Sequence, residues 1–184
     1  MCAVFNEARL ESRRLVLRPP TLNDAGWIAD RINDPDIARM TTRVPHPYGV
    51  EDAVGFLEAV AGTNGARERV FVIERAAGPV GVSGFHEQAT TWSPTGAALS
   101  PEIGYWLARD VWGDGLATEA VQAALDWAQR SWGLRAVAAG HFADNPASGR
   151  VLEKAGFLYT GEIQHRPSLA RGDAAPTRMM VWLA

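Results

Sequence analysis

The sequence has little cysteine, no large excess of charge of either sign and no long hydrophobic run. Its one cysteine, Cys2, excludes an internal disulfide framework and a cysteine-rich metal site. The 18 basic and 21 acidic side chains give a net charge of −3, so no basic surface is expected to attract nucleic acid or an anionic membrane. No apolar run approaches the ~20 residues that span a bilayer, and the start of the chain lacks a secretory-signal pattern. We therefore expect a cytoplasmic protein with no nucleic-acid partner and no membrane partner.

The length and composition are those of an ordinary globular protein. Of the 184 residues, 47% are apolar and 21% are charged, which suits one domain. No repeat, low-complexity tract or linker divides the chain. We expect a single domain spanning residues 1–184.

Apolar patterning predicts short strands that alternate with helices. Runs of β-branched and aromatic residues predict strands at 14–18, 70–73, 80–85, 102–107, 136–142, 157–161 and 179–183. Helical spacing predicts helices after the Thr21–Asp24 cap and at 50–61, 116–132 and 146–155. The polar segments Glu87–Ser100 and His165–Thr177 are predicted to be loops. The order predicts an α+β fold, with a mixed, mainly antiparallel sheet flanked by helices.

Two of these helices have an apolar stripe that predicts their buried face. The stripe of the helix at 50–61 consists of Val50, Val54, Leu57 and Ala61. The stripe of the helix at 116–132 consists of Leu116, Ala120, Ala124 and Ala128, with Val121 and Leu125 beside it.

The most informative segment is 103–120, where a strand enters a glycine-bearing turn that opens directly into a helix. Gly113 and Gly115 permit backbone conformations and close approach that side chains prevent. The unpaired N–H groups of the first helical turn and the helix dipole favour an anion there. The turn therefore suits a phosphate, and a tight turn without a ligand is the alternative. A Walker loop needs lysine where Leu116 stands, and the dinucleotide fingerprint needs glycine where Thr118 stands, so both are excluded.

A second segment, residues 144–157, has the signals of another helix. Asn145 suits the N-cap, Pro146 the first helical position and Gly156 the C-terminal cap. Gly149 is unusual, because a glycine inside a helix costs about 1 kcal/mol relative to alanine.

Three blocks together resemble the GNAT superfamily of acetyl-CoA-dependent N-acetyltransferases. They are Glu-Ile-Gly-Tyr-Trp-Leu at 102–107, Trp-Gly-Asp-Gly-Leu-Ala-Thr-Glu-Ala at 112–120, and Asn-x-x-Ser-x-x-Val-Leu-Glu-Lys-Ala-Gly-Phe at 145–157. In this order they are similar to the RimJ/RimL-type branch, which acetylates ribosomal-protein N-termini. The segments 15–18 and 81–85 also match, so the resemblance covers nearly the whole chain. It implies the GNAT acyl-CoA N-acyltransferase fold and acetyl-CoA as cosubstrate.

The resemblance also implies which residues bind the cofactor. The turn would hold the CoA pyrophosphate through backbone N–H groups, and the strand before it would pair with the pantetheine arm. Asn145 would bind the same arm, and Ser148 would lie near the thioester sulfur. The predicted cofactor-binding residues are Tyr105, Trp106, Leu107, Trp112, Gly113, Asp114, Gly115, Leu116, Ala117, Thr118, Asn145 and Ser148. Asp114 departs from the wider family pattern, because a basic residue often stands at its position.

Acetyl transfer to an amine needs a base for the ammonium proton, donors for the developing oxyanion and an acid for the thiolate. Glu102 is the candidate base, acting through a water, because it shares one strand face with Gly104. A strand-edge glutamate in solvent is the alternative. Ser148 and then Tyr159 are the candidate acids, with a hydroxyl bonded inside its own helical turn and a packing tyrosine as alternatives. A backbone N–H near Tyr105 is expected to meet the acetyl oxygen.

The four histidines have no metal-ligand spacing, so no metal is assigned. His86 is a candidate for lining the acceptor pocket at a strand end. A surface or core histidine is the alternative reading of His86.

The expected reaction is direct transfer in a ternary complex, because no positioned nucleophile is apparent. By resemblance the leading acceptor is a peptide or protein N-terminus, followed by a small cationic amine. The acidic residues Asp24, Asp30, Asp34 and Asp36 suit a cationic acceptor, or form a solvated face. The alternative function is a non-catalytic CoA-binding sensor or interaction module. The oligomeric state is expected to be a monomer or a homodimer.

Overall fold

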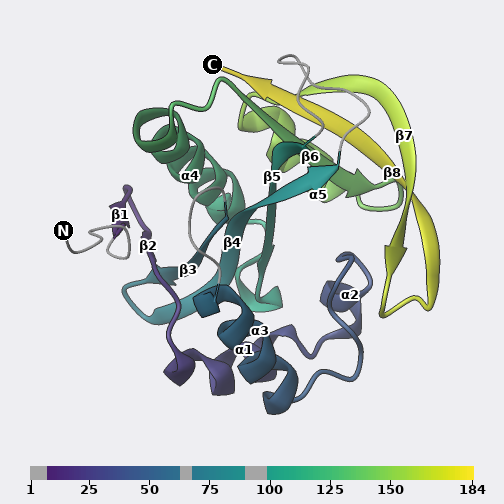
Figure 1. Cartoon of the computed structure of the whole chain (residues 1–184). Helices are drawn as coiled ribbons and strands as arrows, with labels where there is room; N and C mark the ends of the chain where they lie inside the picture. The colour runs from purple at the N-terminus through teal and green to yellow at the C-terminus, as the bar shows by residue number, and fades with distance from the viewer. Residues whose placement is uncertain (1–7, 63–67, 90–98) are drawn as a thin grey trace.

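The computed structural model describes residues 8–62, 68–89 and 99–184, which form one mixed sheet and the helices around it (Figure 1). The strands are β1 (Leu10–Glu11), β2 (Val16–Arg18), β3 (Arg69–Arg75), β4 (Gly78–Ala89), β5 (Leu99–Leu107), β6 (Ala136–Phe142), β7 (Leu158–Ser168) and β8 (Asp173–Leu183). The α-helices are α1 (Ala25–Ile32), α2 (Pro35–Ala38), α3 (Val50–Gly62), α4 (Leu116–Trp132) and α5 (Pro146–Lys154). Two 3₁₀ turns, η1 (Leu22–Asp24) and η2 (Arg109–Val111), precede α1 and α4. None of these described helices is long and apolar enough to cross a membrane.

The sheet has the strand order β1-β2-β3-β4-β5-β6-β8-β7, and within the described strands the one parallel pair is β5 with β6. The ladder between β4 and β5 includes every residue from Leu99 to Leu107. The ladder between β5 and β6 has the single register pair Glu102↔Ala138, although β6 continues to pair with β8 as far as Phe142. Beyond Glu102, therefore, the C-terminal half of β5 has no strand partner on its β6 side among the described residues.

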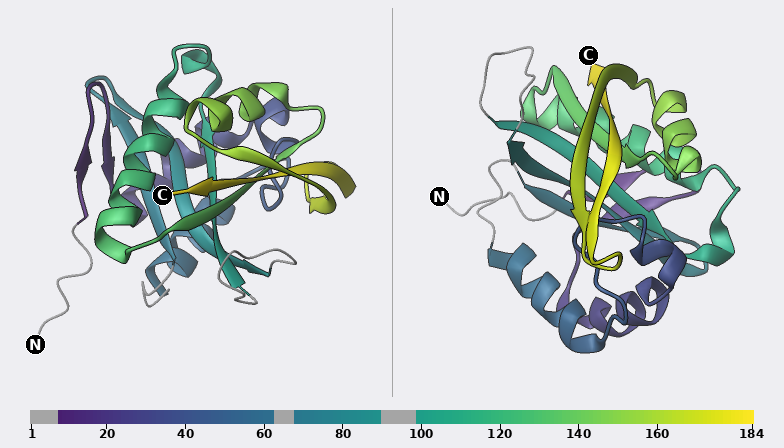
Figure 2. Two further views of the ribbon diagram at one scale, coloured as in Figure 1. Left: turned by 90° about the horizontal axis from the view of Figure 1, so that it is seen from above. Right: turned by 90° about the vertical axis from the view of Figure 1, so that its right-hand side faces the viewer.

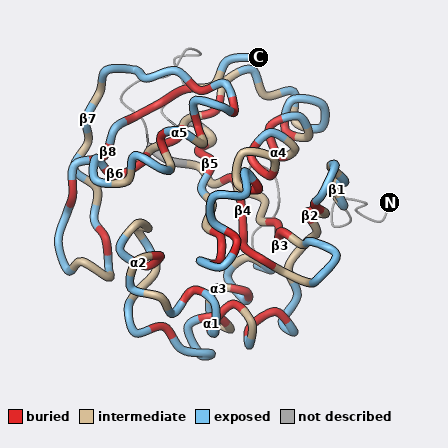
Figure 3. The backbone as a smooth tube through the Cα atoms, turned by 180° about the vertical axis from the view of Figure 1, so that it is seen from behind, coloured by how far each residue is buried: buried red, intermediate tan, exposed pale blue. Residues whose placement is uncertain are grey.

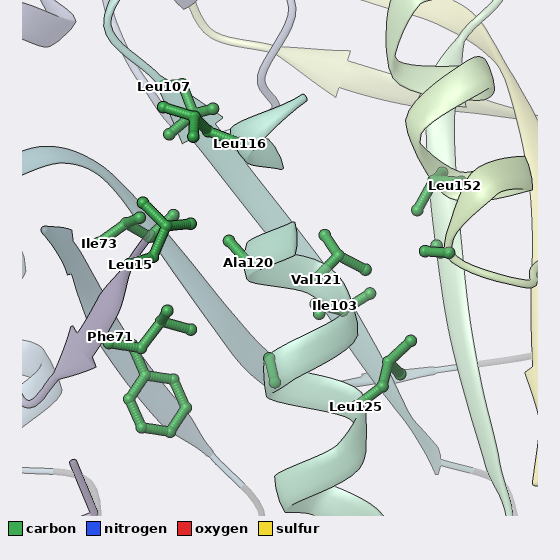
Figure 4. Packing of buried hydrophobic residues seen from close by; sticks show 14 of the residues in the cluster. Leu15, Phe71, Ile73, Ile103, Leu107, Leu116, Ala120, Val121, Leu125 and Leu152 are labelled. Atoms are coloured by element: carbon green, nitrogen blue, oxygen red, sulfur yellow. The ribbon is translucent and has the colours of Figure 1, made fainter. Parts of the chain in front are cut away.

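One face of the sheet is covered by α4 and α5 (Figure 2). Leu116, Ala120, Val121 and Leu125 lie between α4 and the strands, close to the buried residues of β5 (Figure 4). Ala124 and Ala128 are also fully buried, so the stripe predicted for this helix is confirmed. This packing anchors the helix whose first turn follows β5.

The opposite face is covered by α1 and α3. Ile28 and Ile32 of α1 and Leu57 of α3 pack there with Val82 and Trp106 of the sheet. Buried residues therefore follow both sides of the central strands, whereas β7 at the edge is largely exposed (Figure 3).

The stripe predicted for α3 was partly wrong. Val50 is 54% exposed and Ala61 is exposed, whereas Ala53 and Leu57 are buried. The cause is that α3 packs chiefly against α1, and its first turn and last residues extend beyond this contact.

Both predicted loops were partly wrong. In the first, β4 extends to Ala89 and β5 begins at Leu99, and residues 90–98 lie outside the described part of the chain. In the second, β7 and β8 form a long antiparallel hairpin that pairs His165 with Pro176. A proline is compatible with this hairpin, because Pro176 lies just beyond the end of the β6–β8 ladder, where a missing N–H is tolerated.

Asp24 is a buried carboxylate that joins β2 to the start of α1. It accepts hydrogen bonds from both terminal nitrogens of Arg18 (2.9 and 2.7 Å), from Trp27 Nε1 (2.7 Å) and from the Thr21 backbone N–H (2.7 Å). Burial alone would raise the pKa of Asp24, but these hydrogen bonds hold it at about 2. The folded pKa lies below the ordinary value of 3.8, so the stabilisation is complete above that value and is lost as the pH falls toward 2.

Asp24→Asn is expected to lower the free energy of unfolding by about 3 kcal/mol at pH 7, because Arg18 loses its buried partner. Urea unfolding measures this, and the difference from wild type should shrink as the pH is lowered from about 4 to 2. Asp30→Asn is the control, because the Asp30 side chain is 80% exposed, and it should change stability by less than about 0.5 kcal/mol. Equal effects at the two positions would contradict the role given to Asp24.

Candidate active site

The turn between β5 and α4 is shaped by two glycines in the left-handed region. Gly113 has φ 86° and Gly115, the N-cap of α4, has φ 76°. The N–H groups of Leu116, Ala117 and Thr118 have no carbonyl partner within the helix, because Glu119 N–H makes the first helical bond, to the Gly115 oxygen. A Cβ placed on Gly113 would meet nothing within 4 Å, so the space beside the turn is open. The turn can therefore receive an anionic group.

One side chain of the turn and one from the loop before β2 hold the turn in place. Trp112 Nε1 donates to the Leu107 carbonyl (2.8 Å), and the Arg109 guanidinium lies 5.1 Å from the centroid of the Trp112 ring. Arg14 donates to the Asp114 carbonyl (3.0 Å), which fastens the turn to the loop before β2. The turn is thus ordered by contacts that do not use its outward N–H groups.

The acidic side chain of this turn has a basic neighbour. The Asp114 carboxylate lies 3.9 Å from Arg75. Glu119, in the first turn of α4, accepts from Ser12 Oγ (2.8 Å) and from the backbone and Nε of Arg14 (both 2.7 Å). Both carboxylates therefore face arginines, so the departure from the family pattern at Asp114 does not leave a lone negative charge at the turn.

The residues predicted to pair with pantetheine lie at the end of β5, where β5 and β6 are no longer paired. Tyr105 and Leu107 pack on the α4 side, whereas Trp106 points to the α1 side, where its ring lies 6.0 Å from that of Trp27. Glu102 and Trp106 therefore share the second face, as the alternation of the strand predicts.

The start of α5 brings two candidate groups together. The Asn145 side-chain oxygen accepts from the Ser148 N–H (3.1 Å), which caps the helix. Ser148 Oγ lies 2.8 Å from Tyr105 Oη across the gap, so this hydroxyl pairs with another element rather than within its own turn. Burial raises the pKa of Tyr105 to about 12, with the Ser148 hydrogen bond opposing the rise, so the phenol remains protonated at neutral pH.

Tyr159 lies against Gly149, the residue after Ser148 in α5. Its hydroxyl is 3.1 Å from His141 Nε2, and a Cβ on Gly149 would lie 2.8 Å from that hydroxyl and 2.9 Å from that nitrogen. Gly149 therefore makes room for the His141–Tyr159 pair, which explains a glycine inside a helix.

Glu102 is buried and paired, which excludes a strand-edge glutamate in solvent. Its side chain is 8% exposed, and Arg166 of β7 donates to both of its oxygens (2.5 and 2.9 Å). In the sheet order β8 and β6 lie between β7 and β5, so Arg166 reaches across small residues, Ala175 opposite it on β8 and Gly140 on β6. His86 of β4, the register partner of Glu102, has its Nε2 3.9 Å from the carboxylate.

Arg166 was not singled out in the sequence, because its segment was predicted to be a loop. The available signal was the alternation of polar side chains along Glu162, Gln164 and Arg166, which form a hydrogen-bonded row (2.8 and 3.0 Å). Such period-two spacing is typical of one strand face.

Of the four acidic residues near the N-terminal helices, Asp30 is 80% exposed and the other three accept hydrogen bonds from arginines. Asp24 is paired with Arg18, and Arg109 donates to both oxygens of Asp34 (2.6 and 2.9 Å) and to Asp36. Asp34 and Arg109 also line a surface groove of about 590 Å³ between α1 and the end of β5. Over residues 8–62, 68–89 and 99–184 no group of three metal-ligating side chains comes together.

Comparisons with known proteins agree with this geometry. The family model described as "Acetyltransferase (GNAT) domain" matches residues 14–158, more than half of the chain. An uncharacterized N-acetyltransferase, YoaA from Bacillus subtilis, is 28% identical over 158 residues, which are 84% of this chain and 85% of that protein. The chain therefore belongs to the GNAT acetyltransferase family.

Solved structures share the fold. RimL, described as a ribosomal L7/L12 alpha-N-protein acetyltransferase in complex with coenzyme A, has a TM-score of 0.78 at 18% identity, covering 96% of this chain and 98% of that chain. A spermidine N-acetyltransferase from Vibrio cholerae, in complex with CoA and spermine, has a TM-score of 0.73 at 21% identity, covering 94% and 96%. The expected GNAT fold and acetyltransferase class are confirmed.

Gly149→Ala is expected to destabilise the protein, although the same change usually stabilises a helix by up to about 1 kcal/mol. The added methyl would displace Tyr159 or His141, and overpacking of this kind costs about 1–3 kcal/mol. Gly55→Ala in α3 is the matched control, because a Cβ there meets nothing within 4 Å. In chemical unfolding, the free energy of unfolding should fall for Gly149→Ala and rise for Gly55→Ala. A gain in stability at Gly149 would show that the pair does not need the space.

Proposed function

We propose that the protein transfers acetyl from acetyl-CoA to a primary amine within a ternary complex. The observation that carries this proposal is the position of the glycine turn. The turn lies between α4 and β5, the strand whose β6 side is unpaired beyond Glu102. A phosphate at the turn would lie at one end of this gap, and an extended arm would continue along the exposed backbone of β5.

The chain's own residues suit acetyl-CoA. The N–H groups of Leu116, Ala117 and Thr118 would hold the pyrophosphate, with Trp112, Gly113, Asp114 and Gly115 shaping the turn. The backbone of Tyr105, Trp106 and Leu107 would pair with pantetheine, and Asn145 would donate to it from the side-chain nitrogen. When bound, the cofactor supplies the acetyl group as a thioester.

Glu102, Ser148 and Tyr159 are the proposed catalytic groups. Removal of the amine proton depends on Glu102, which acts without direct contact because both of its oxygens already accept from Arg166. Ser148 is the acid for the departing thiolate, supported by its hydrogen bond to the protonated Tyr105. Tyr159, beside Gly149 on the same helix, is the second candidate acid.

We further propose a peptide or protein N-terminus as the acceptor, rather than a polyamine. The carboxylates that would attract a polycation are largely occupied by arginines, namely Asp24 by Arg18 and Asp34 by Arg109. A neutral α-amine also forms more readily, because its pKa of about 8 lies below the ~10.4 of a lysine-type amine.

Purified protein with acetyl-CoA should release thiol when given peptides with a free N-terminus, and release less with spermidine. Glu102→Gln should lower kcat by about 100-fold while the acetyl-CoA affinity from calorimetry stays within about threefold. Glu11→Gln on β1, 74% exposed, is the control and should leave both unchanged. Binding of acetyl-CoA without turnover on any amine would instead favour the CoA-binding module.

Initial rates at varied concentrations of both substrates should give intersecting double-reciprocal lines. The hydroxyl proposed to lie beside the thioester, that of Ser148, contacts the Tyr105 phenol and not a histidine or a carboxylate that could activate it as a nucleophile. Parallel lines, together with an acetylated enzyme in the mass spectrum, would contradict direct transfer.

A further inference from the structure

We propose that His86 receives the proton of the acceptor amine, with Glu102 behind it as the charge partner. The inference rests on the proposed function and names the group through which Glu102 acts. The sequence predicts that Glu102 acts through a water, and we propose that the His86 imidazole, 3.9 Å from the carboxylate, takes this part instead.

His86 lies at the open part of the second sheet face. A Cβ on the exposed Gly104 would have the His86 ring carbon Cε1 as its nearest neighbour, at 3.9 Å, so the imidazole borders the bare backbone of β5. Gly104 is two residues beyond Glu102, where β5 has lost β6 as its partner. An acetyl group held by the β5 backbone beside Gly104 would be adjacent to this ring.

Glu102 itself is poorly placed to receive a proton. Arg166 donates to both carboxylate oxygens, so protonation would break a buried bidentate pair. The His86 side chain, in contrast, has no hydrogen bond to another described residue, and its Nε2 is 3.9 Å from Glu102 Oε1. A proton on His86 would create an ion pair with Glu102 at this distance.

Burial, together with the charges around His86, keeps the imidazole neutral. Burial lowers its pKa, as do Arg43 from the α2–α3 connection and Arg166 from β7. Glu102 of β5 and Glu68, just before β3, oppose the change without reversing it. A lowered pKa leaves the ring neutral at pH 7, the form that a general base requires.

The step balances without any further reactant. An ammonium proton moves to His86 Nε2, and the freed electron pair of the nitrogen forms the C–N bond to the acetyl carbon. The C–S bond breaks with its electron pair on sulfur. The second amine proton leaves as the amide forms, sulfur takes up one proton, and the imidazolium returns the other to solvent.

His86→Gln should lower kcat by about 100-fold and leave the KM for acetyl-CoA within about threefold. The fall of kcat at acid pH should be present in wild type and absent in the variant. Added imidazole should raise the rate of His86→Ala by about tenfold or more, because the substitution removes the ring and free imidazole can supply the same base. His165→Gln is the matched control, since His165 is exposed on β7 and outside the site.

The activity of the wild-type protein distinguishes the failure of the proposed function from the failure of the His86 proposal. If the wild type acetylates no amine, the proposed function itself is overturned. With an active wild type, a His86→Gln variant that keeps its rate and pH profile while Glu102→Gln loses activity would return the base to Glu102 acting through water. If the His86 variants lose activity, imidazole does not restore it and the fall of kcat at acid pH remains, His86 has a structural role and the proposal is overturned. An unchanged acetyl-CoA thermal shift in both variants shows that they fold.

Discussion

The separation of β5 from β6 after one register pair is the constraint on which the rest of the site depends. Strands that stay paired leave no backbone for a ligand, whereas β5 beyond Glu102 has one side open. The same strand ends in the glycine turn that begins α4, so the proposed phosphate site and the open edge of β5 follow one another. The buried stripe of α4 packs in the core and so fixes the position of this turn relative to the sheet.

Charge on the second sheet face is arranged as pairs rather than as a field. Arg166 pairs with Glu102 and Arg109 pairs with Asp34, so these two carboxylates are not free to attract a polycation. The Glu102 pair also joins β7 to the central sheet, which places the exposed edge hairpin beside the proposed acceptor site. The proposed acceptor preference and the proposed route of the proton both rest on these ion pairs.

Local signals made much of this predictable from sequence. The left-handed glycines before α4 and the cap of α5 are short-range features, and the structure has both helices where the patterns predict them. The contact of Arg166 with Glu102 is not local, because it joins strands that are 64 residues apart in sequence. The hairpin that carries Arg166 was hidden by prolines that an edge position tolerates. Pairing across a sheet is set by topology, which sequence periodicity alone does not specify.

Thermal unfolding with and without acetyl-CoA tests the central claim, that the turn and the open strand together form a CoA site. At about 100 times its dissociation constant, acetyl-CoA should add about 2.7 kcal/mol, which raises the Tm of a protein of this size by about 5–10 °C. ATP and NAD at the same concentration should give a much smaller change. The absence of a shift at saturating acetyl-CoA, or an equal shift with all three ligands, would contradict the account.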